Sequence, residues 1–215
     1  MPKRQLTKAE LLEVAATVVT RYGFAKTSMA DIATTAGVSK GLLYLRFPDK
    51  DALLMSLLDR EFVLALRATL TRVDADERGG LLSRIYLHTL HGLRSRPLLW
   101  SFYVTRDPQL NRFAQRGDPG RYERRIEAGR TFMRRLYDDG IIQSDLGGQV
   151  TGVLWLFTFG LAASAPHQGA DQLIEGVAEL VQRGLDADVA DTEPGKRAFR
   201  RFVTDLTATT EWSDE

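Results

Sequence analysis

The sequence predicts an all-α protein with a small N-terminal head and a larger helical body. Apolar residues recur at the three- and four-residue spacing of amphipathic helices, and no stretch of useful length alternates as a half-buried strand does. The chain has 215 residues, of which 44% are hydrophobic and 27% charged, an ordinary composition for a globular protein. It has no cysteine, which excludes a disulfide framework and thiolate metal sites. No apolar secretory core follows the first, basic residues, so we expect a cytoplasmic protein.

The first expected helix runs from Thr7 to Tyr22. Thr7 and Glu10 have the spacing of a capping box, and Gly23 is suited to ending the helix. The apolar residues between them share one face: Leu11, Val14, Ala15, Val18, Val19 and Tyr22. We expect this helix to support the two that follow.

The stretch 27–47 predicts two short helices joined by a tight turn. Thr27 or Ser28 can cap the first helix, Gly37 suits a left-handed turn, and Ser39 can cap the second helix. Small and apolar residues are spaced to meet where the helices cross: Ile32, Ala33, Ala36, Val38 and Leu43. This is the steric pattern of a helix-turn-helix, whose second helix faces the major groove of DNA. An ordinary helical corner is the alternative.

The continuation of the sequence favours the helix-turn-helix. Leu43-Tyr44-x-x-Phe47, followed by Pro48-Asp49-Lys50 and a leucine-rich segment, resembles the TetR family of bacterial repressors over residues 7 to 60. Two positions depart from the family pattern. Leu42 stands where a small polar residue is usual, which puts a phosphate contact in doubt, and Arg46 stands where histidine or tyrosine is usual.

The distribution of charge agrees with a DNA-binding head. Residues 1–50 carry eight Lys or Arg and four Asp or Glu, so this part is +4, whereas the whole chain is only +1. A basic head on a mildly acidic body is expected if only the head meets phosphates. A solvated basic face is the alternative.

We expect the DNA contacts to come from the N-terminal arm, the helix N-termini and the second helix of the motif. Lysines and arginines neutralise phosphates, hydroxyls anchor the backbone, and a glycine permits close approach to the bases. The candidate residues are Lys3, Arg4, Thr27, Ser28, Ser39, Lys40, Gly41, Leu42, Tyr44, Arg46 and Lys50. Leu42 either meets a thymine methyl group or packs beneath Tyr22 or Leu45.

The body is expected to consist of further helices. Residues 1–50 are assigned to the DNA-binding domain and residues 51–215 to an effector-binding and dimerisation domain. Residues 146–170 contain no charged side chain, but their glycines and Pro166 favour a buried helix over a membrane span. The expected helices cover Asp49–Asp74, Asp76–Arg96, Pro97–Thr105, a short segment to Phe113, Tyr122–Asp139, Leu146–Ala170, Asp171–Leu185 and a segment after Pro194.

The family resemblance implies two further sites in the body. One is an intersubunit four-helix bundle that makes a homodimer, for which the candidates are Val153, Leu156, Phe157, Gly160, Leu173, Val177, Leu180 and Val181. The other is an effector pocket for an apolar or aromatic small molecule. Its candidates, for each of which a core position is the favoured alternative, are Tyr86, His88, Trp100, Phe102, Tyr103, Phe132, Met133, Tyr137, Trp155 and Phe159.

The predicted function is a ligand-responsive transcriptional regulator, a repressor that binds a palindromic operator as a homodimer. A helical carrier or sensor of an apolar small molecule, without specific DNA binding, is the alternative. We expect no enzymatic activity and no cofactor, because the sequence lacks a phosphate-binding loop and a nucleophile motif. We expect no metal site, because His88 and His91 have no carboxylate near them in the sequence.

Overall fold

The computed structural model describes residues 6–104, 119–164 and 169–208, and every regular element in these ranges is a helix. The chain divides into two compact units, Met1–Val63 and Leu64–Thr209. The all-α class is therefore confirmed. The functional boundary expected between residues 50 and 51 stays a prediction.

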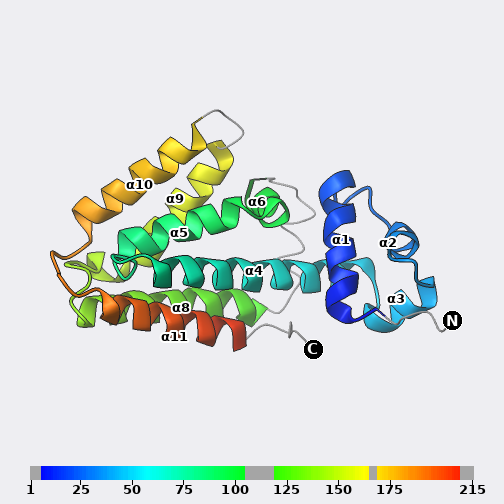
Figure 1. Ribbon diagram of the computed structural model, residues 1–215, viewed down its shortest axis with the longest axis horizontal. Coiled ribbons are helices and arrows are strands. Elements are labelled where there is room, and N and C mark those ends of the chain that lie inside the picture. The colour runs from blue at the N-terminus through cyan, green and yellow to red at the C-terminus, as the bar shows by residue number, and fades with distance from the viewer. Residues whose placement is uncertain (1–5, 105–118, 165–168, 209–215) are drawn as a thin grey trace. The chain divides into compact units, whose positions relative to one another are not determined.

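The first unit contains α1 (Lys8–Tyr22), α2 (Met29–Ala36), α3 (Lys40–Arg46) and the beginning of α4 (Lys50–Ala75), as Figure 1 shows. The expected capping box begins α1: the Thr7 amide donates to Glu10 Oε2 over 2.8 Å, and the Glu10 amide donates to Thr7 Oγ1 over 3.2 Å. Its core is made of side chains with almost no exposed surface: Leu11, Leu12, Ile32, Leu43, Phe47, Leu53, Leu54 and Leu57. These residues hold α2 and α3 against α1 and α4.

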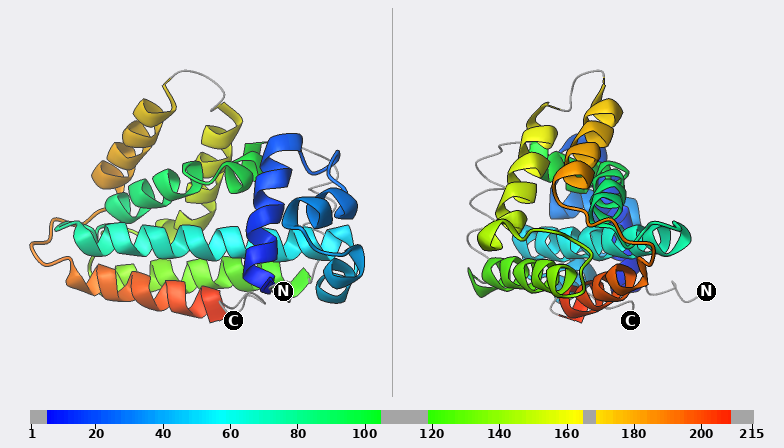
Figure 2. Two further views of the ribbon diagram at one scale, coloured as in Figure 1. Left: turned by 45° about the vertical axis from the view of Figure 1, so that its right-hand side comes forward. Right: turned by 90° about the vertical axis from the view of Figure 1, so that its left-hand side faces the viewer.

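The second unit contains the rest of α4 and the later helices. They are α5 (Leu82–Arg94), α6 (Pro97–Val104), α8 (Pro119–Asp138), a 3-10 turn (Leu146–Gly148), α9 (Val150–Ser164), α10 (Ala170–Gly184) and α11 (Glu193–Ala208). Helix α5 packs against α10, and α8 packs against α11, as both views in Figure 2 show, while α9 contacts α6, α8 and α10.

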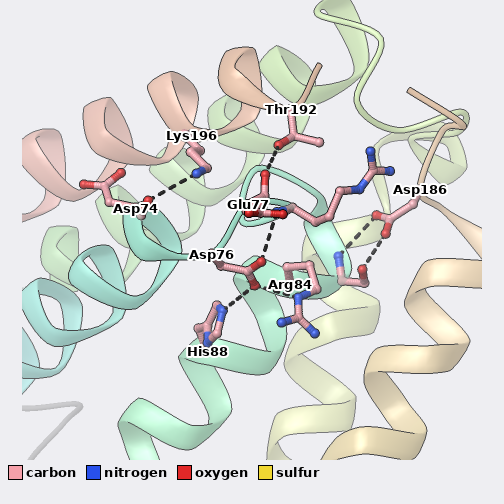
Figure 3. A network of polar contacts seen from close by, with 10 residues as sticks. Asp74, Asp76, Glu77, Arg84, His88, Asp186, Thr192 and Lys196 are labelled. Carbon is pink, nitrogen blue, oxygen red and sulfur yellow. Dashed lines mark hydrogen bonds and ion pairs between the residues drawn. The ribbon is translucent and has the colours of Figure 1, made fainter. Parts of the chain in front are cut away.

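Helix α5 begins at Leu82, six residues later than the sequence pattern indicated. The reason is a tight loop between α4 and α5 that approaches the start of α11. A Cβ atom on Gly80 would lie 1.7 Å from the carbonyl oxygen of Thr192, so only glycine fits there. Thr192 Oγ1 in turn donates to the carbonyl oxygen of Glu77 over 3.2 Å, and Lys196 Nζ donates to that of Asp74 over 3.2 Å (Figure 3).

The uncharged segment 146–170 forms a shorter helix than expected. Helix α9 begins at Val150, because Gly147 and Gly148 adopt positive φ angles in the preceding turn. Among the described residues, no helix is long and apolar enough to cross a membrane.

Candidate nucleic-acid interface

The turn between α2 and α3 has the geometry expected of a helix-turn-helix. Gly37 adopts the left-handed conformation, with φ of 66° and ψ of 27°, and the Val38 amide donates to the carbonyl oxygen of Ala33 over 3.0 Å. Ile32, Ala33 and Leu43 are fully buried where the two helices cross. The turn and the crossing therefore hold α3 in one orientation on the head.

Hydroxyl caps begin both helices of the motif. Ser28, rather than Thr27, caps α2: its Oγ accepts from the Asp31 amide, while its own amide donates to Asp31 Oδ2 over 2.8 Å. Hydrogen bonds from the side chain and the backbone of Ser28 lower the pKa of Asp31, so this carboxylate is ionised at the N-terminus of α2. Ser39 caps α3 by accepting from the Leu42 amide over 3.2 Å.

The outer face of α3 is open to solvent. Lys40, Gly41 and Arg46 are exposed, and Tyr44 keeps 49% of its surface. Leu42 is half-buried, so it reaches the surface only in part. This short helix thus presents two cations, a phenol and a close backbone approach on one solvent-facing surface.

Leu45 is the residue that the predicted set of DNA contacts omits. It is 83% exposed, more than any other large apolar side chain described. Helical spacing places it on the same side of α3 as Gly41 and Leu42, which precede it by four and three residues. That spacing could have identified it, because Leu43 is buried on the opposite side of the helix.

Lys50, at the start of α4, is partly engaged within the head. Its Nζ lies 4.2 Å from the ring centroid of Phe24 and donates to the carbonyl oxygen of Ala25 over 3.4 Å. Burial lowers the pKa of Lys50, and the nearby Asp51 opposes this effect. The side chain therefore has a structural role besides any contact with DNA.

Thr27 differs from the other candidates because it is buried. Its Oγ1 donates to the carbonyl oxygen of Gly23 over 2.9 Å, so its hydroxyl hydrogen is already used inside the head. As a DNA contact Thr27 stays a prediction. Lys3 and Arg4 lie outside the described residues.

The candidate effector residues lie in several separate places of the second unit. Phe132 joins an aromatic cluster with Phe199 and Phe202 of α11, at centroid distances of 5.8 and 4.9 Å. Trp155 contacts Phe159 one turn later on α9, with ring centroids 4.7 Å apart. In the described part of the chain, Phe132 and Trp155 therefore belong to separate aromatic clusters, and the role of these residues as a pocket stays a prediction.

Tyr86 is buried and connects α5 to α9. Its hydroxyl donates to the carbonyl oxygen of Leu154 over 2.9 Å and lies 2.8 Å from Thr158 Oγ1. Burial raises the pKa of Tyr86 to about 12. This hydroxyl is already satisfied without a ligand.

The remaining candidate effector residues are less informative. Trp100 packs against the buried residues Ala65, Leu93 and Leu99, Met133 is half-buried, and Tyr137 is exposed. Phe102 and Tyr103 belong to α6, but the described part of the structure does not include their side chains.

His88 is held by a polar network at the start of α5. Its Nε2 lies 2.9 Å from Asp76 Oδ2, which also accepts from Arg84 Nε over 2.7 Å (Figure 3). Sequence analysis did not pair His88 with a carboxylate, because Asp76 lies twelve residues earlier in the chain and comes close only in the folded structure. Within the described ranges, no three His, Cys, Asp or Glu side chains are grouped so that they could hold a metal ion.

The candidate dimer residues mark an apolar surface on α9 and α10. Leu156 is 74% exposed, and Phe157, Leu173 and Leu180 are also exposed large apolar side chains. Gly160 is exposed as well, and Val153 and Val177 are half-buried. Val181 differs, because it is 3% exposed and belongs to the core of its own chain.

Comparison with protein-family models gives one match in the head. Residues 11–57 match the model described as bacterial regulatory proteins of the tetR family. This segment covers α1, α2, α3 and the first turns of α4.

Two curated relatives match the same end of the chain. Mb2274c of Mycobacterium bovis, described as an uncharacterized HTH-type transcriptional regulator, is 34% identical over 79 residues, which cover 37% of this chain and 41% of the relative. The HTH-type transcriptional regulator TtgR of Pseudomonas putida is 42% identical over 55 residues, 26% of each chain. The matched segments thus span less than half the length of these relatives.

Solved structures extend the likeness to the body. SmeT, the repressor of the Stenotrophomonas maltophilia multidrug efflux pump SmeDEF, superposes with a TM-score of 0.63 over 86% of this chain and 92% of its own. A complex of SmeT with triclosan gives a TM-score of 0.62 over 86% of this chain and 93% of its own. At 16% and 18% identity these matches establish a common fold.

Proposed function

Because the chain belongs to the TetR family of bacterial transcriptional regulators, we propose that it is a ligand-responsive repressor that binds a palindromic operator as a homodimer. The observation that carries the proposal is the exposed outer face of α3, held by the Gly37 turn and capped by Ser39. A recognition helix needs this combination of rigid support and an open, cationic surface.

The DNA contacts follow from the chemistry of that face. Lys40 and Arg46 neutralise phosphates, and the Tyr44 hydroxyl donates to a phosphate oxygen. Gly41 lets the backbone of α3 approach the bases, and a Cβ atom built there would have only Ser39 Oγ beside it, 4.0 Å away. Leu45 supplies the most exposed apolar surface for a thymine methyl group.

The remaining predicted contacts have supporting roles. The hydroxyls of Ser28 and Ser39 and the amides at the starts of α2 and α3 favour phosphate oxygens. Lys50 contributes positive charge, and Leu42 offers a second, smaller apolar contact. We propose that Lys3 and Arg4 act as a basic arm that contacts the DNA.

The homodimer is supported by the apolar surface of α9 and α10. Leu156, Leu173 and Leu180 are exposed in the single chain, although the hydrophobic effect favours their burial. A second copy would cover the same surface with its own, as a two-fold axis requires. Two recognition helices can then read half-sites about 35 Å apart, one turn of DNA.

The alternative of a carrier without specific DNA binding finds no support, because the relatives that match the head are HTH-type transcriptional regulators. The effector is a small molecule in the proposal, and the SmeT–triclosan complex is a precedent in a protein of the same fold. The cytoplasmic location is a further part of the proposal.

Fluorescence anisotropy with DNA from upstream of the gene for this chain tests the proposal. Affinity should fall with salt, with a log–log slope of several units, and should exceed the affinity for scrambled DNA. Tyr44→Ala should weaken operator binding without changing the dimer, whereas Arg183→Ala, on the exposed face of α10, should bind as the parent does. Equal affinity for operator and scrambled DNA would overturn specific binding.

A further inference from the structure

A cationic groove lies between α4 and α5, apart from the predicted DNA contacts. It has a volume of about 500 Å³ and is lined by Arg72, His88, His91, Arg94 and Ser95. All five residues belong to the second unit, so the groove exists independently of the head. We propose that this groove binds the anionic group of a small molecule, a carboxylate or a phosphate, through Arg72, His91 and Arg94.

The spacing of the residues on α5 creates one cationic stripe. His88, His91 and Arg94 follow one another at three-residue intervals, so they share a face of the helix. Two of them lie in the last turn of α5, where cations also complement the helix dipole. The dipole of α5 does not account for the position of Arg72, because Arg72 belongs to α4.

Gly92 brings Arg72 close to this stripe. A Cβ atom at position 92 would lie 2.6 Å from Thr69 Oγ1 and 3.9 Å from Arg72 Nη1. The absence of a side chain there lets α4 and α5 approach closely, so the Arg72 guanidinium lies near the α5 backbone. Cations from two helices therefore converge on one groove.

The nearby carboxylates leave positive charge available. Asp76 is engaged by Arg84 and His88, and Asp171 of α10 forms an ion pair with Arg94. For Arg72, no ion pair with a carboxylate is found in the described part of the chain. A guanidinium can donate two parallel hydrogen bonds to a carboxylate or phosphate, which makes Arg72 the principal anchor.

Ser95 has a smaller part in this site. Its Oγ donates to the carbonyl oxygen of Gly92 over 2.8 Å, so its hydrogen is not available to an anion. His88 is held by Asp76 at its Nε2. The direct donors are therefore Arg72, a protonated His91 and those N–H groups of Arg94 that do not face Asp171.

His91 makes the binding dependent on pH. Burial lowers its pKa; Asp171 of α10 opposes this, and the charges of Arg72 on α4 and of His88 and Arg94 on α5 add to it. Protonation of His91 is therefore less favourable in the folded chain than in the unfolded one. Without a bound anion, the free energy of unfolding therefore falls as the pH falls through the ordinary histidine pKa of 6.5. An anion beside His91 offsets that loss, so anion binding takes up a proton and is tighter at lower pH.

Calorimetric titration of the full chain, without DNA and at constant ionic strength, tests the site. The probes are inorganic phosphate, hexanoate and the neutral hexanamide. Phosphate or hexanoate should bind, hexanamide should not, and Arg72→Gln should weaken the binding about tenfold. The matched control is Arg183→Gln, which removes an equally long cation from the exposed face of α10 and should change nothing.

The pH arm uses hexanoate, which does not titrate near neutral pH. Binding should be tighter at about pH 6 than at about pH 8, and His91→Gln should abolish the difference. Preference for phosphate or for hexanoate would define the natural anion, and either preference supports the site. Failure of both anions to bind, equal binding of hexanamide, or equal loss in Arg72→Gln and Arg183→Gln would overturn it.

Any effect of such a ligand on the operator rests on the proposed function, whereas the titration itself does not. Loss of anion binding with operator binding intact would therefore refute the groove alone. Loss of operator binding with anion binding intact would refute the repressor alone.

Discussion

The head and the body of this chain are stabilised over different distances in the sequence. In the head, Thr7 pairs with Glu10 and Ser28 pairs with Asp31, each across three residues. In the body, Thr192 pairs with Glu77 across 115 residues. The comparison teaches that the head is specified by local signals, whereas the body depends on contacts that exist only after the chain has folded.

The start of α5 illustrates the difference. Its N-cap position is Leu81, which has no side chain able to cap a helix. The Ser83 amide donates instead to Oδ1 of Asp186, 103 residues away, over 3.2 Å. Burial raises the pKa of Asp186, while the hydrogen bonds from Ser83 oppose this effect. A distant residue thus does for α5 what Ser28 does for α2.

The largest effect is expected from breaking a long-range contact of the body. Gly80→Ala places a methyl group against the carbonyl oxygen of Thr192, where a Cβ would lie only 1.7 Å away. The Thr192 carbonyl is backbone and the new Cβ is fixed to the backbone of residue 80, so neither group can rotate away. We therefore expect the free energy of unfolding to fall by about 3 kcal/mol or more. Urea denaturation followed by circular dichroism measures it. Gly176→Ala, with nothing within 4 Å of the new methyl group, is the control and should be neutral or slightly stabilising. Equal stability of the two variants would contradict this account of the loop.

The second effect concerns the apolar surface of the body. Leu156→Glu should weaken dimerisation about a hundredfold, because a carboxylate would be buried without a partner in the proposed interface. Sedimentation velocity over a range of concentrations measures the change. Leu146→Glu is the matched control, since this leucine is also exposed, at 45%, but precedes α9. A dimer unchanged by Leu156→Glu would place the interface elsewhere.

A smaller effect is expected from one cation of the head. Lys40→Ala should weaken operator binding about tenfold and reduce the log–log salt slope by about one unit. The dimer should persist, because the side chain is exposed on α3. Anisotropy titrations at several salt concentrations provide the measurement, with Arg183→Ala as the control. An unaltered slope would remove Lys40 from the phosphate contacts.

The smallest effect is expected from a local signal of the head. Ser28→Ala removes the N-cap of α2 and should lower the free energy of unfolding by about 1 kcal/mol. Thr34→Ala, on the exposed side of the same helix, should change it by less than about 0.5 kcal/mol. Thermal unfolding of both variants checks the difference. If the two variants unfold alike, the cap does not stabilise the head.

Several predictions from the sequence were confirmed because they depend on neighbours along the chain. The capping box at Thr7, the left-handed Gly37 and the cap at Ser39 each involve residues within one turn. The start of α5 was placed too early, because residues 76–81 form a loop whose Gly80 packs against Thr192 at the start of α11. Periodicity identifies a buried face, but it does not identify the partner of that face.

The candidate effector residues show the same limit. Phe132, Trp155 and Tyr86 are all aromatic residues on inward or partly buried faces, yet they contact three different sets of neighbours. Residue type and spacing could not distinguish a core aromatic from one that lines a cavity. For the cationic groove, the spacing of His88, His91 and Arg94 gave only the stripe on α5, since Arg72 joins it only when α4 packs on α5.

The amino-acid sequence by itself determined the helical class and the helix-turn-helix head, because caps, turns and periodicity act within a few residues. It also determined that the head is basic. Only the tertiary structure decided which apolar side chains stay exposed on α9 and α10, where α5 begins, and that cations of two helices line one groove. The physical reason is that burial and charge neutralisation depend on groups far apart in the chain, whose meeting no local pattern encodes.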